Sequence, residues 1–303
     1  MSSPLTFSTA IMLTLPPLLW AGNAIVGRLV HDAISPFTLN LLRWSLALLL
    51  LLPLAGHVLR KNSAIWQCWK QYAVLGILGI GSYNGLLYLA LKTSSPINVT
   101  LVGSSMPIWM LLIGRIGFGT PITGRQAAGG VLSVLGVALV LSRGSVQQLL
   151  GLQLVPGDWF MLLATIVWSL YSWLLARSAH TMPSQTAVRG HWAAFLLAQL
   201  IFGLGWSAVL AGGELATGHG LLVPSWKLAA AMLFIVLGPA ILAYRFWGEG
   251  VKRAGPATAG FFANLMPLFT ALLSIPILGE MPQLYHALAF ALIVGGIVVS
   301  SRR

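Results

Sequence analysis

The sequence predicts an all-α membrane protein whose ten transmembrane helices form two inverted five-helix repeats around a central cavity. Three observations predict this class. First, 57% of the 303 residues are hydrophobic and only 7% are charged, whereas about a quarter of the residues are charged in typical soluble domains. Second, apolar stretches long enough to cross about 30 Å of hydrocarbon recur along the whole chain. Third, the two halves of the chain align with each other.

The spans follow from apolar stretches of about 17–25 residues that end at turn signals or charges. The longest connection between them, from Gly212 to Ser225, is too short for a soluble domain. We therefore expect one membrane-embedded domain, with the first repeat in residues 1–150 and the second, inverted repeat in residues 151–303. The predicted spans are 8–29, 36–56, 71–92, 95–118, 123–142, 157–177, 184–211, 226–250, 254–278 and 283–301.

The repeat is visible as two fixed offsets between the halves. An odd number of helices per repeat forces the second half to cross the membrane in the opposite sense, as in many secondary transporters. An offset of 148 residues places Trp20 on Trp168, Arg43 on His191 and Trp44 on Trp192. An offset of 160 residues aligns Lys92 to Arg143 with the C-terminal part, pairing Met106 and Pro107 with Met266 and Pro267, and Gly136 with Gly296.

The charge distribution indicates how the chain is oriented. A net charge of +12, from 17 basic and 5 acidic residues, could indicate a nucleic-acid partner. However, no basic run exceeds two residues, and the basic residues punctuate apolar stretches, so we expect no nucleic-acid binding. With both termini in the cytoplasm of a bacterium, only Arg28, Arg43, Lys92, Arg143 and Lys227 lie towards the opposite face of the inner membrane, in agreement with the positive-inside rule.

Several other classes are disfavoured by missing motifs. The sequence contains no His-Glu-x-x-His pattern and no Gly-rich loop ending in Gly-Lys-Ser/Thr, which zinc proteases and nucleotide-binding enzymes require. Asp32 and Asp158 both lie at span ends, so they cannot form a catalytic pair inside the membrane. We therefore expect no enzyme, no metal and no cofactor. The apolar stretch from Leu5 to Gly27 is long enough for a first helix and does not resemble a cleaved signal.

Three short motifs carry a resemblance to a known family. They are Trp20-Ala21-Gly22-Asn23 in the first span, Pro36 followed by Leu42-Arg43-Trp44 in the second, and Gly279-Glu280 before the last. With five plus five spans, the chain resembles the EamA-type permeases of the drug/metabolite transporter superfamily, most closely the YddG-type exporters of aromatic and other neutral amino acids. The resemblance implies a basket of helices around a central cavity, supported from behind by helices five and ten, and transport by alternating access.

Polar and aromatic residues at mid-span predict a substrate site. In the first span, Pro16, Trp20, Asn23 and Gly27 share one helix face that lipid would not select. The alternative for the aromatic residues is helix packing. Arg43 could instead extend to the periplasmic interface, and His191 could be a packed histidine. The predicted substrate-binding residues are Trp20, Asn23, Arg43, Asn84, Tyr88, Trp109, Trp168, Tyr171, His191, Tyr244, Trp247 and Asn264.

Two prolines predict hinges. Pro107 and Pro267 occupy matching positions in the fourth and ninth spans. A proline removes one helical hydrogen bond and leaves a carbonyl free, which a membrane tolerates only where protein, polar side chains or water satisfy that carbonyl. We therefore expect both helices to bend beside the cavity and to act in gating; a kink that serves packing alone is the alternative.

The predicted substrate follows from which charges are missing. No Asp or Glu lies at mid-span, so the chain lacks the buried carboxylate that proton-coupled export of cationic drugs normally uses. Amides, indoles and phenols suit a zwitterion, whose ammonium group can meet aromatic faces while its carboxylate meets Arg43. We expect facilitated or weakly coupled export of neutral amino acids, with membrane lipid around a monomer or homodimer. Export of purines, sugars or drugs, and a scaffold or lipid-handling role, are the alternatives.

Overall fold

The computed structural model consists of helices joined by short connections. It describes residues 5–94, 96–142, 144, 145, 147, 150, 151, 155–182, 188, 190–278 and 284–301. Within these residues strand-type pairing is limited to one isolated antiparallel bridge, between Ile34 and Leu222. The class predicted from the composition, an all-helical chain, is therefore confirmed for the part of the chain that the structure describes.

The helices follow one another in chain order with few interruptions. In the first half they are α1 (Phe7–Leu29), α2 (Pro36–Ala55), η1 (Gly56–Leu59), η2 (Ala64–Trp66), α3 (Trp69–Leu75), η3 (Gly76–Ser82), α4 (Tyr83–Thr93), α5 (Pro96–Gly103), α6 (Met106–Phe118) and α7 (Gly124–Leu141). In the second half they are α9 (Pro156–Thr181), α11 (Trp192–Ala216), α12 (Trp226–Ile235), η5 (Val236–Leu242), α13 (Ala243–Ala254), α14 (Pro256–Ala263), α15 (Leu265–Leu278) and α16 (Leu284–Ser301).

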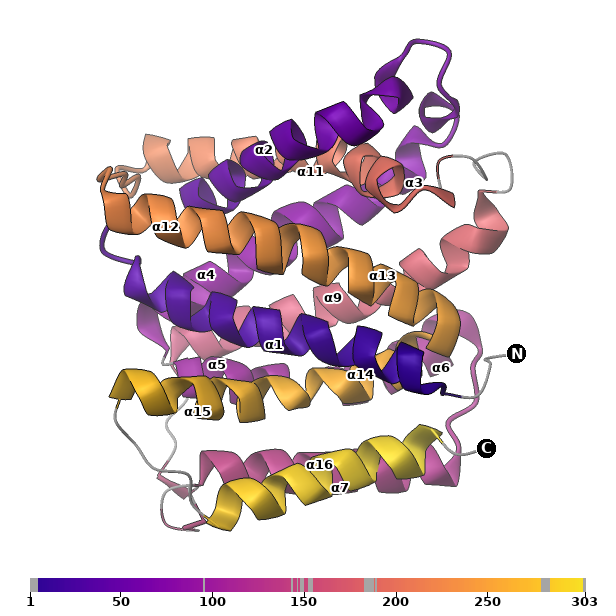
Figure 1. Ribbon diagram of the computed structural model, residues 1–303, viewed down its shortest axis with the longest axis vertical. Coiled ribbons are helices and arrows are strands. Elements are labelled where there is room, and N and C mark those ends of the chain that lie inside the picture. The colour runs from indigo at the N-terminus through magenta and orange to yellow at the C-terminus, as the bar shows by residue number, and fades with distance from the viewer. Residues whose placement is uncertain are drawn as a thin grey trace.

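The long helices lie roughly alongside one another, and both chain ends lie at the same end of the bundle (Figure 1). Among the described residues, seven helical stretches are long and apolar enough to cross a membrane, and Met106–Phe118 and Ala287–Ser300 are shorter apolar helices. Many of their side chains, such as Leu49, Val209 and Leu233, are exposed. An apolar outer surface of this kind is what a lipid environment requires.

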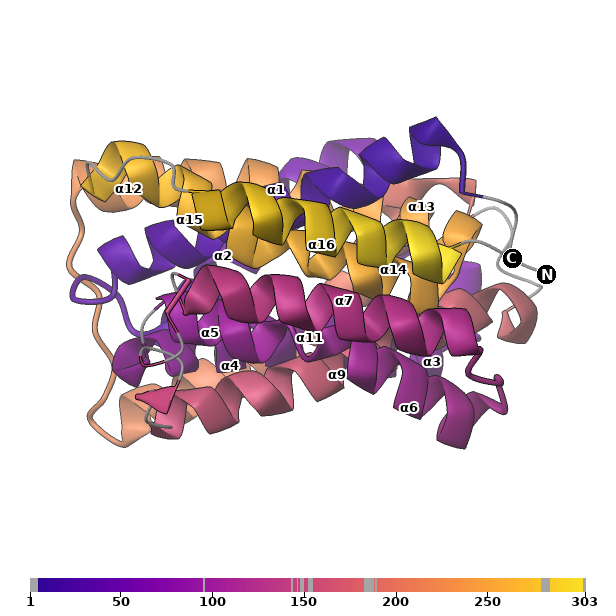
Figure 2. The ribbon, with the colours of Figure 1, turned by 90° about the horizontal axis from the view of Figure 1, so that it is seen from below.

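Helices α7 and α16 pack side by side at one edge of the bundle (Figures 1 and 2). Their contact depends on small residues. A Cβ atom on Gly129 would lie only 2.6 Å from the carbonyl oxygen of Gly296, and a Cβ atom on Gly136 would lie 2.9 Å from the carbonyl oxygen of Ala289. Close approach of two backbones through small residues is typical of helix pairs in membranes. The edge position of this pair matches the supporting role that the resemblance implies for helices five and ten.

Two long helices contain π-helical segments at matching positions. The segment η3 (Gly76–Ser82) separates α3 from α4, and η5 (Val236–Leu242) separates α12 from α13. The two segments are 160 residues apart, the same offset that aligns the later part of the repeat. A π-helical turn leaves backbone groups without their usual helical partners and is frequent at functional sites.

The predicted kinks at the matched prolines are interruptions of the helix. Helix α5 ends at Gly103 and α6 begins at Met106; α14 ends at Ala263 and α15 begins at Leu265. Pro107 and Pro267 therefore lie in the first turns of α6 and α15, where proline is tolerated because the break has already removed the helical partner of its missing N–H.

The contact between α11 and η3 provides a stability test with a matched control. A Cβ atom on Gly203 would lie 2.5 Å from Cβ of Ile80 and 2.8 Å from the carbonyl oxygen of Gly76, whereas one on Gly205 would have no neighbour within 4 Å. We expect G203A to lower the free energy of unfolding by about 1–3 kcal/mol, as overpacking does, and G205A to leave it unchanged or raised. Thermal unfolding in detergent measures both, and equal melting temperatures would contradict the close packing.

Candidate functional site

The centre of the bundle contains a group of packed aromatic rings, here called the aromatic cluster. Trp168 lies at its middle, with ring centroids 4.6 Å from Tyr83, 4.9 Å from Tyr171 and 5.1 Å from Trp20. All members are buried. Tyr171 and Tyr244 also line an open cavity described below, whereas Trp20, Trp168 and Trp247 fill the space with one another, so the predicted cavity lining by these three indoles stays a prediction. The members are Trp20, Trp44, Tyr83, Trp168, Tyr171, Tyr244 and Trp247.

Hydrogen bonds tie this aromatic cluster to the two π-helical segments. The indole N–H of Trp20 donates to the carbonyl oxygen of Pro239 in η5 at 3.3 Å. The hydroxyl of Tyr244 donates to the carbonyl oxygen of Gly79 in η3. Gly79 and Pro239 are themselves 160 residues apart. The indole nitrogen of Trp168 has no partner among the described residues. The π-helical turns thus supply the carbonyl groups that orient Trp20 and Tyr244.

Beside the aromatic cluster lies a group of polar side chains, here called the arginine network, formed by Asn23, Arg43, Asn84 and Tyr88. One guanidinium nitrogen of Arg43 donates both to Oδ1 of Asn84 and to the hydroxyl of Tyr88, at 2.8 Å each. Tyr88 then donates to Oδ1 of Asn23 at 2.7 Å, and Asn84 donates to the hydroxyl of Tyr244 at 3.0 Å. The arginine network therefore connects α1, α2, α4 and α13.

Arg43 is a fully buried cation that has no anionic partner among the described residues. Its side chain is 0% exposed, and its Nε and second terminal nitrogen find no acceptor among the described residues. The described carboxylates are bonded elsewhere in the chain. The ring of Trp44 lies 4.9 Å from the guanidinium carbon, a cation–π contact that stabilises the charge only in part. A buried charge without a counter-ion is costly, so this site is suited to accept an anionic group.

A cavity of about 910 Å³, here called the vestibule, leads towards these groups from one end of the bundle. Its walls come from α1, α9, α11 and α13, and they include Thr6 near the N-terminus, so the vestibule opens at the end where the chain begins (Figure 1). Tyr171, Gln199 and Tyr244 are its innermost wall residues, and Arg245, Glu249, Lys252 and Arg253 lie at its mouth. From Tyr244, two hydrogen bonds through Asn84 lead to Arg43.

Most of the predicted site residues meet in one place, but three do not. His191 is exposed and caps α11, its Nδ1 accepting from the backbone N–H of Ala194 at 3.3 Å. It therefore lies apart from Arg43, whose equivalent it is in the repeat, and its predicted substrate contact stays a prediction. Trp109 donates to Ser105 within its own helix. The residues that the structure brings together are Trp20, Asn23, Arg43, Asn84, Tyr88, Trp168, Tyr171, Tyr244 and Trp247.

Asn264 lies at the break between α14 and α15. It is 0% exposed, and neither its amide nitrogen nor its amide oxygen has a partner among the described residues. The vestibule walls include neither Asn264 nor Pro107, Trp109 or Pro267. The vestibule is therefore framed in part by α11, the seventh predicted span, and not by helices four and nine, whose place beside a cavity stays a prediction.

The sequence analysis missed several residues of the site. Gln199 accepts a hydrogen bond of 3.1 Å from the hydroxyl of Tyr171 at the vestibule floor, and Ser172 accepts one of 3.1 Å from the indole of Trp247. Trp44 and Tyr83 belong to the aromatic cluster. Gln199 could have been predicted from the sequence, because it is the single side-chain amide within the apolar helix α11 and polar groups at membrane depth usually have a function.

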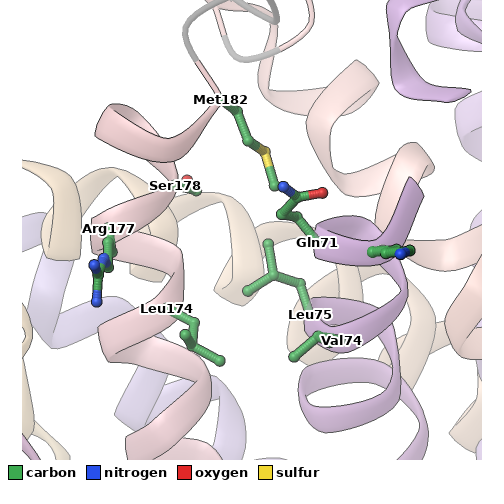
Figure 3. Close-up of a pocket in the computed structure, with 8 residues that line it drawn as sticks. Gln71, Val74, Leu75, Leu174, Arg177, Ser178 and Met182 are labelled. Atoms are coloured by element: carbon green, nitrogen blue, oxygen red, sulfur yellow. The ribbon is translucent and has the colours of Figure 1, made fainter. Parts of the chain in front are cut away.

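A second hollow, of about 400 Å³, lies between α3 and α9. Figure 3 shows Val74 and Leu75 of α3 opposite Leu174 of α9, with Met182 above them, while the guanidinium of Arg177 points away from the gap. The ring of Phe118 lies 5.7 Å from the guanidinium carbon of Arg177. The facing walls are therefore apolar, and this hollow is less suited to a charged metabolite than the vestibule is.

A membrane bundle with an open vestibule that ends on buried polar and aromatic groups defines a small-molecule transporter. The EamA-like transporter family matches residues 7–142 and 155–302 of the chain. The chain belongs to this family, and it is therefore a multi-pass membrane transporter and not an enzyme.

Relatives with curated descriptions have low sequence identity to this chain but align over most of it. The aromatic amino acid exporter YddG of Ancylobacter novellus is 27% identical over 290 residues, which cover 94% of this chain and 93% of the relative. A probable terminal-alkyne amino-acid exporter of Streptantibioticus cattleyicolor is 24% identical over 96% and 92% of the two chains. A crystal structure superposes with a TM-score of 0.72 at 22% identity over 96% of each chain, which shows that the fold is shared.

Proposed function

We propose that this transporter exports neutral amino acids, aromatic ones included, from a bacterial cytoplasm by alternating access, as a facilitated or weakly coupled carrier. The single observation that carries this proposal is Arg43, a buried guanidinium with unpaired donors and no described counter-ion. A carboxylate binds a guanidinium through two hydrogen bonds. Because amino acids carry this group beside an ammonium that aromatic rings can hold, the arginine network and the aromatic cluster together suit a zwitterion.

The family relatives support the same substrate class. Two of them are named as exporters of amino acids, the YddG protein of Ancylobacter novellus and the probable terminal-alkyne amino-acid exporter of Streptantibioticus cattleyicolor. In addition, the described residues of the aromatic cluster and the arginine network contain no carboxylate that could exchange a proton for a cationic substrate. We therefore propose that a pH gradient is not needed for transport.

We further propose ten membrane spans arranged as two inverted repeats, residues 1–150 and 151–303, with both termini in the cytoplasm. The spacing of 160 residues between η3 and η5 supports the repeat. Asn84 and Tyr244 are also 160 residues apart, and they bond to each other at the centre of the molecule. With this orientation the vestibule faces the cytoplasm, from which an exporter loads its substrate.

Counterflow in proteoliposomes tests the proposal. Vesicles loaded with an unlabelled amino acid are diluted into a radiolabelled panel of neutral, acidic and basic amino acids, with and without a pH gradient. We expect uptake of the neutral members in both conditions. Uptake that appears only with the gradient would contradict weak coupling, and no uptake of any amino acid would direct the search to purines or sugars.

The matched prolines give a further prediction about transport rate. In P107A with P267A, the new backbone N–H groups can bond to carbonyls one turn earlier and join the broken helices. We expect slower exchange with an unchanged protein level, because each pair of half-helices would then move as one rigid element. Exchange at the wild-type rate would show that the breaks serve packing alone.

A further inference from the structure

The end of the bundle opposite the vestibule, here called the far end, is closed by two chain segments that pair with each other. These segments are residues 30–38, which run from the end of α1 into the first turn of α2, and residues 214–225, which run from the last turn of α11 to the start of α12. The backbone N–H of Ser35 donates to Leu221 at 2.9 Å, and that of Val223 donates to Ala33 at 2.7 Å. Ile34 and Leu222 form the bridge between them. Two connections far apart in the sequence thus form one seam.

Glu214 fastens this seam to the start of α2. Its carboxylate accepts hydrogen bonds from the hydroxyl of Ser35 at 2.6 Å, from the backbone N–H and the hydroxyl of Thr38 at 3.0 and 3.1 Å, and from the backbone N–H of Phe37 at 3.3 Å. Helix α2 has no acidic residue in its first turn, and Ser35 makes no capping bond to its own helix. The free N–H groups of α2 are therefore capped by a side chain from another helix.

The position of Glu214 is unfavourable for its own helix. It lies in the last turn of α11, where a negative charge meets the negative end of the helix dipole, whereas the first turn of α2 presents a positive end. The contact to α2 offsets this cost. Glu214 is thus held by an interaction that lasts only while α2 and α11 stay together at the far end.

Two of the described carboxylates bond to other helices at the far end, whereas the one at the vestibule mouth bonds within its own helix. At the far end, Asp158 of α9 accepts a bond from Ser94, which follows α4, so it also joins two helical segments. At the vestibule mouth, Glu249 pairs with Lys252 and Arg253 of its own helix. Among the described carboxylates, those that join different helices lie at the far end, while the mouth of the vestibule has no such cross-link.

We propose that Glu214 is a positioning residue of the outer gate: it holds the far end closed while the vestibule is open, and it separates from α2 when the far end opens. The proposal rests on the alternating-access mechanism proposed above. The gate is held by polar backbone and hydroxyl groups that water can satisfy after separation, and opening the seam exposes Ile34, which is 1% exposed while the seam is closed. The seam can therefore open and close in each transport cycle.

Thiol labelling tests the gate without any substrate. The only cysteine, Cys68, is replaced by serine, and Ile34, which is 1% exposed in the seam, is replaced by cysteine. In nanodiscs, where both faces are accessible, we expect E214Q to raise the labelling rate of I34C roughly tenfold, the size of effect expected when charge-assisted hydrogen bonds are lost. The matched control E249Q should leave the rate unchanged. An unchanged labelling rate in E214Q overturns the proposal. If E214Q does not fold, T38V serves in its place: it removes only the bond from the Thr38 hydroxyl to Glu214, and it should raise the labelling rate by less than tenfold.

A reversible disulfide across the seam tests whether the far end must open during transport or stays closed. Residues paired across an antiparallel bridge lie at a Cα distance that a disulfide accepts, so I34C with L222C can be oxidised in the C68S background. We expect exchange of a transported solute to stop on oxidation and to return on reduction. Equal exchange in both states would show that the far end stays closed throughout, which overturns the gate. If neither state transports any amino acid, the substrate proposal fails, while the labelling result still decides whether Glu214 holds the seam.

Discussion

Replacing Arg43 by methionine should abolish most transport and leave the folded protein as stable as before, or more stable. The guanidinium is buried without a described counter-ion, and exchanging a buried charge for an apolar side chain of similar volume is often neutral or stabilising. Substrate would lose hydrogen bonds to a charged group, each of which contributes about 1.5–3 kcal/mol. Each lost bond corresponds to a loss of roughly tenfold to a hundredfold in affinity.

Counterflow rates and melting temperatures of R43M, measured on the same preparations, check this expectation. Arg245 provides the matched control, because it lies at the vestibule mouth, exposed, with its guanidinium carbon 4.7 Å from the ring of Trp192. R245M should have little effect on either quantity. Normal transport by R43M would remove Arg43 from the site. Parallel losses of transport and melting temperature would instead assign Arg43 a structural role through Asn84 and Tyr88.

Hydropathy predicted where the helices lie because burial in lipid imposes length and composition on every span. The predicted spans 36–56 and 123–142 differ from α2 and α7 by one residue at an end. The prolines at 107 and 267 indicated the breaks for a local reason, the missing N–H. Val236–Leu242 contains a proline of its own, Pro239, but Gly76–Ser82 does not. A proline alone therefore does not predict a π-helical turn, which depends on how neighbouring helices satisfy the freed carbonyl groups.

The repeat offsets predicted equivalent positions but not equivalent surroundings. Arg43 lies inside α2, whereas His191 directly precedes α11, because the two helices start at different points relative to the aligned residues. A register taken from sequence carries no information about helix starts in three dimensions. His191 consequently serves as a cap, while Arg43 is placed among polar groups of α1 and α4.

Side-chain composition also could not distinguish a cavity wall from a packed centre. Trp20, Trp168 and Trp247 were predicted to line open space because lipid would not select their faces. The same preference is satisfied when such rings pack on one another, as they do here. In a transporter that alternates between conformations, which rings face open space depends on the state, and a single sequence specifies both states at once.

The second large effect is expected at Trp168. Its side chain is 0% exposed and contacts rings on several helices, so W168A would leave a cavity at the centre of the bundle. Truncating a buried tryptophan to alanine typically costs about 3–5 kcal/mol of the free energy of unfolding. In lipid this loss comes from packing, since helix association there has little hydrophobic driving force.

Trp159 supplies the control, because it lies on the same helix α9 and is 61% exposed. W159A should change the free energy of unfolding by no more than about 0.5 kcal/mol, as surface substitutions do. Reversible unfolding in mixed micelles measures both variants. If W168A kept its stability but bound amino acids more weakly, Trp168 would be a direct ligand contact, and its packing partners would have to rearrange around the substrate. A large loss of stability instead means that Trp168 holds the centre of the empty transporter together, so that a substrate could reach Trp168 only by disrupting those packing contacts.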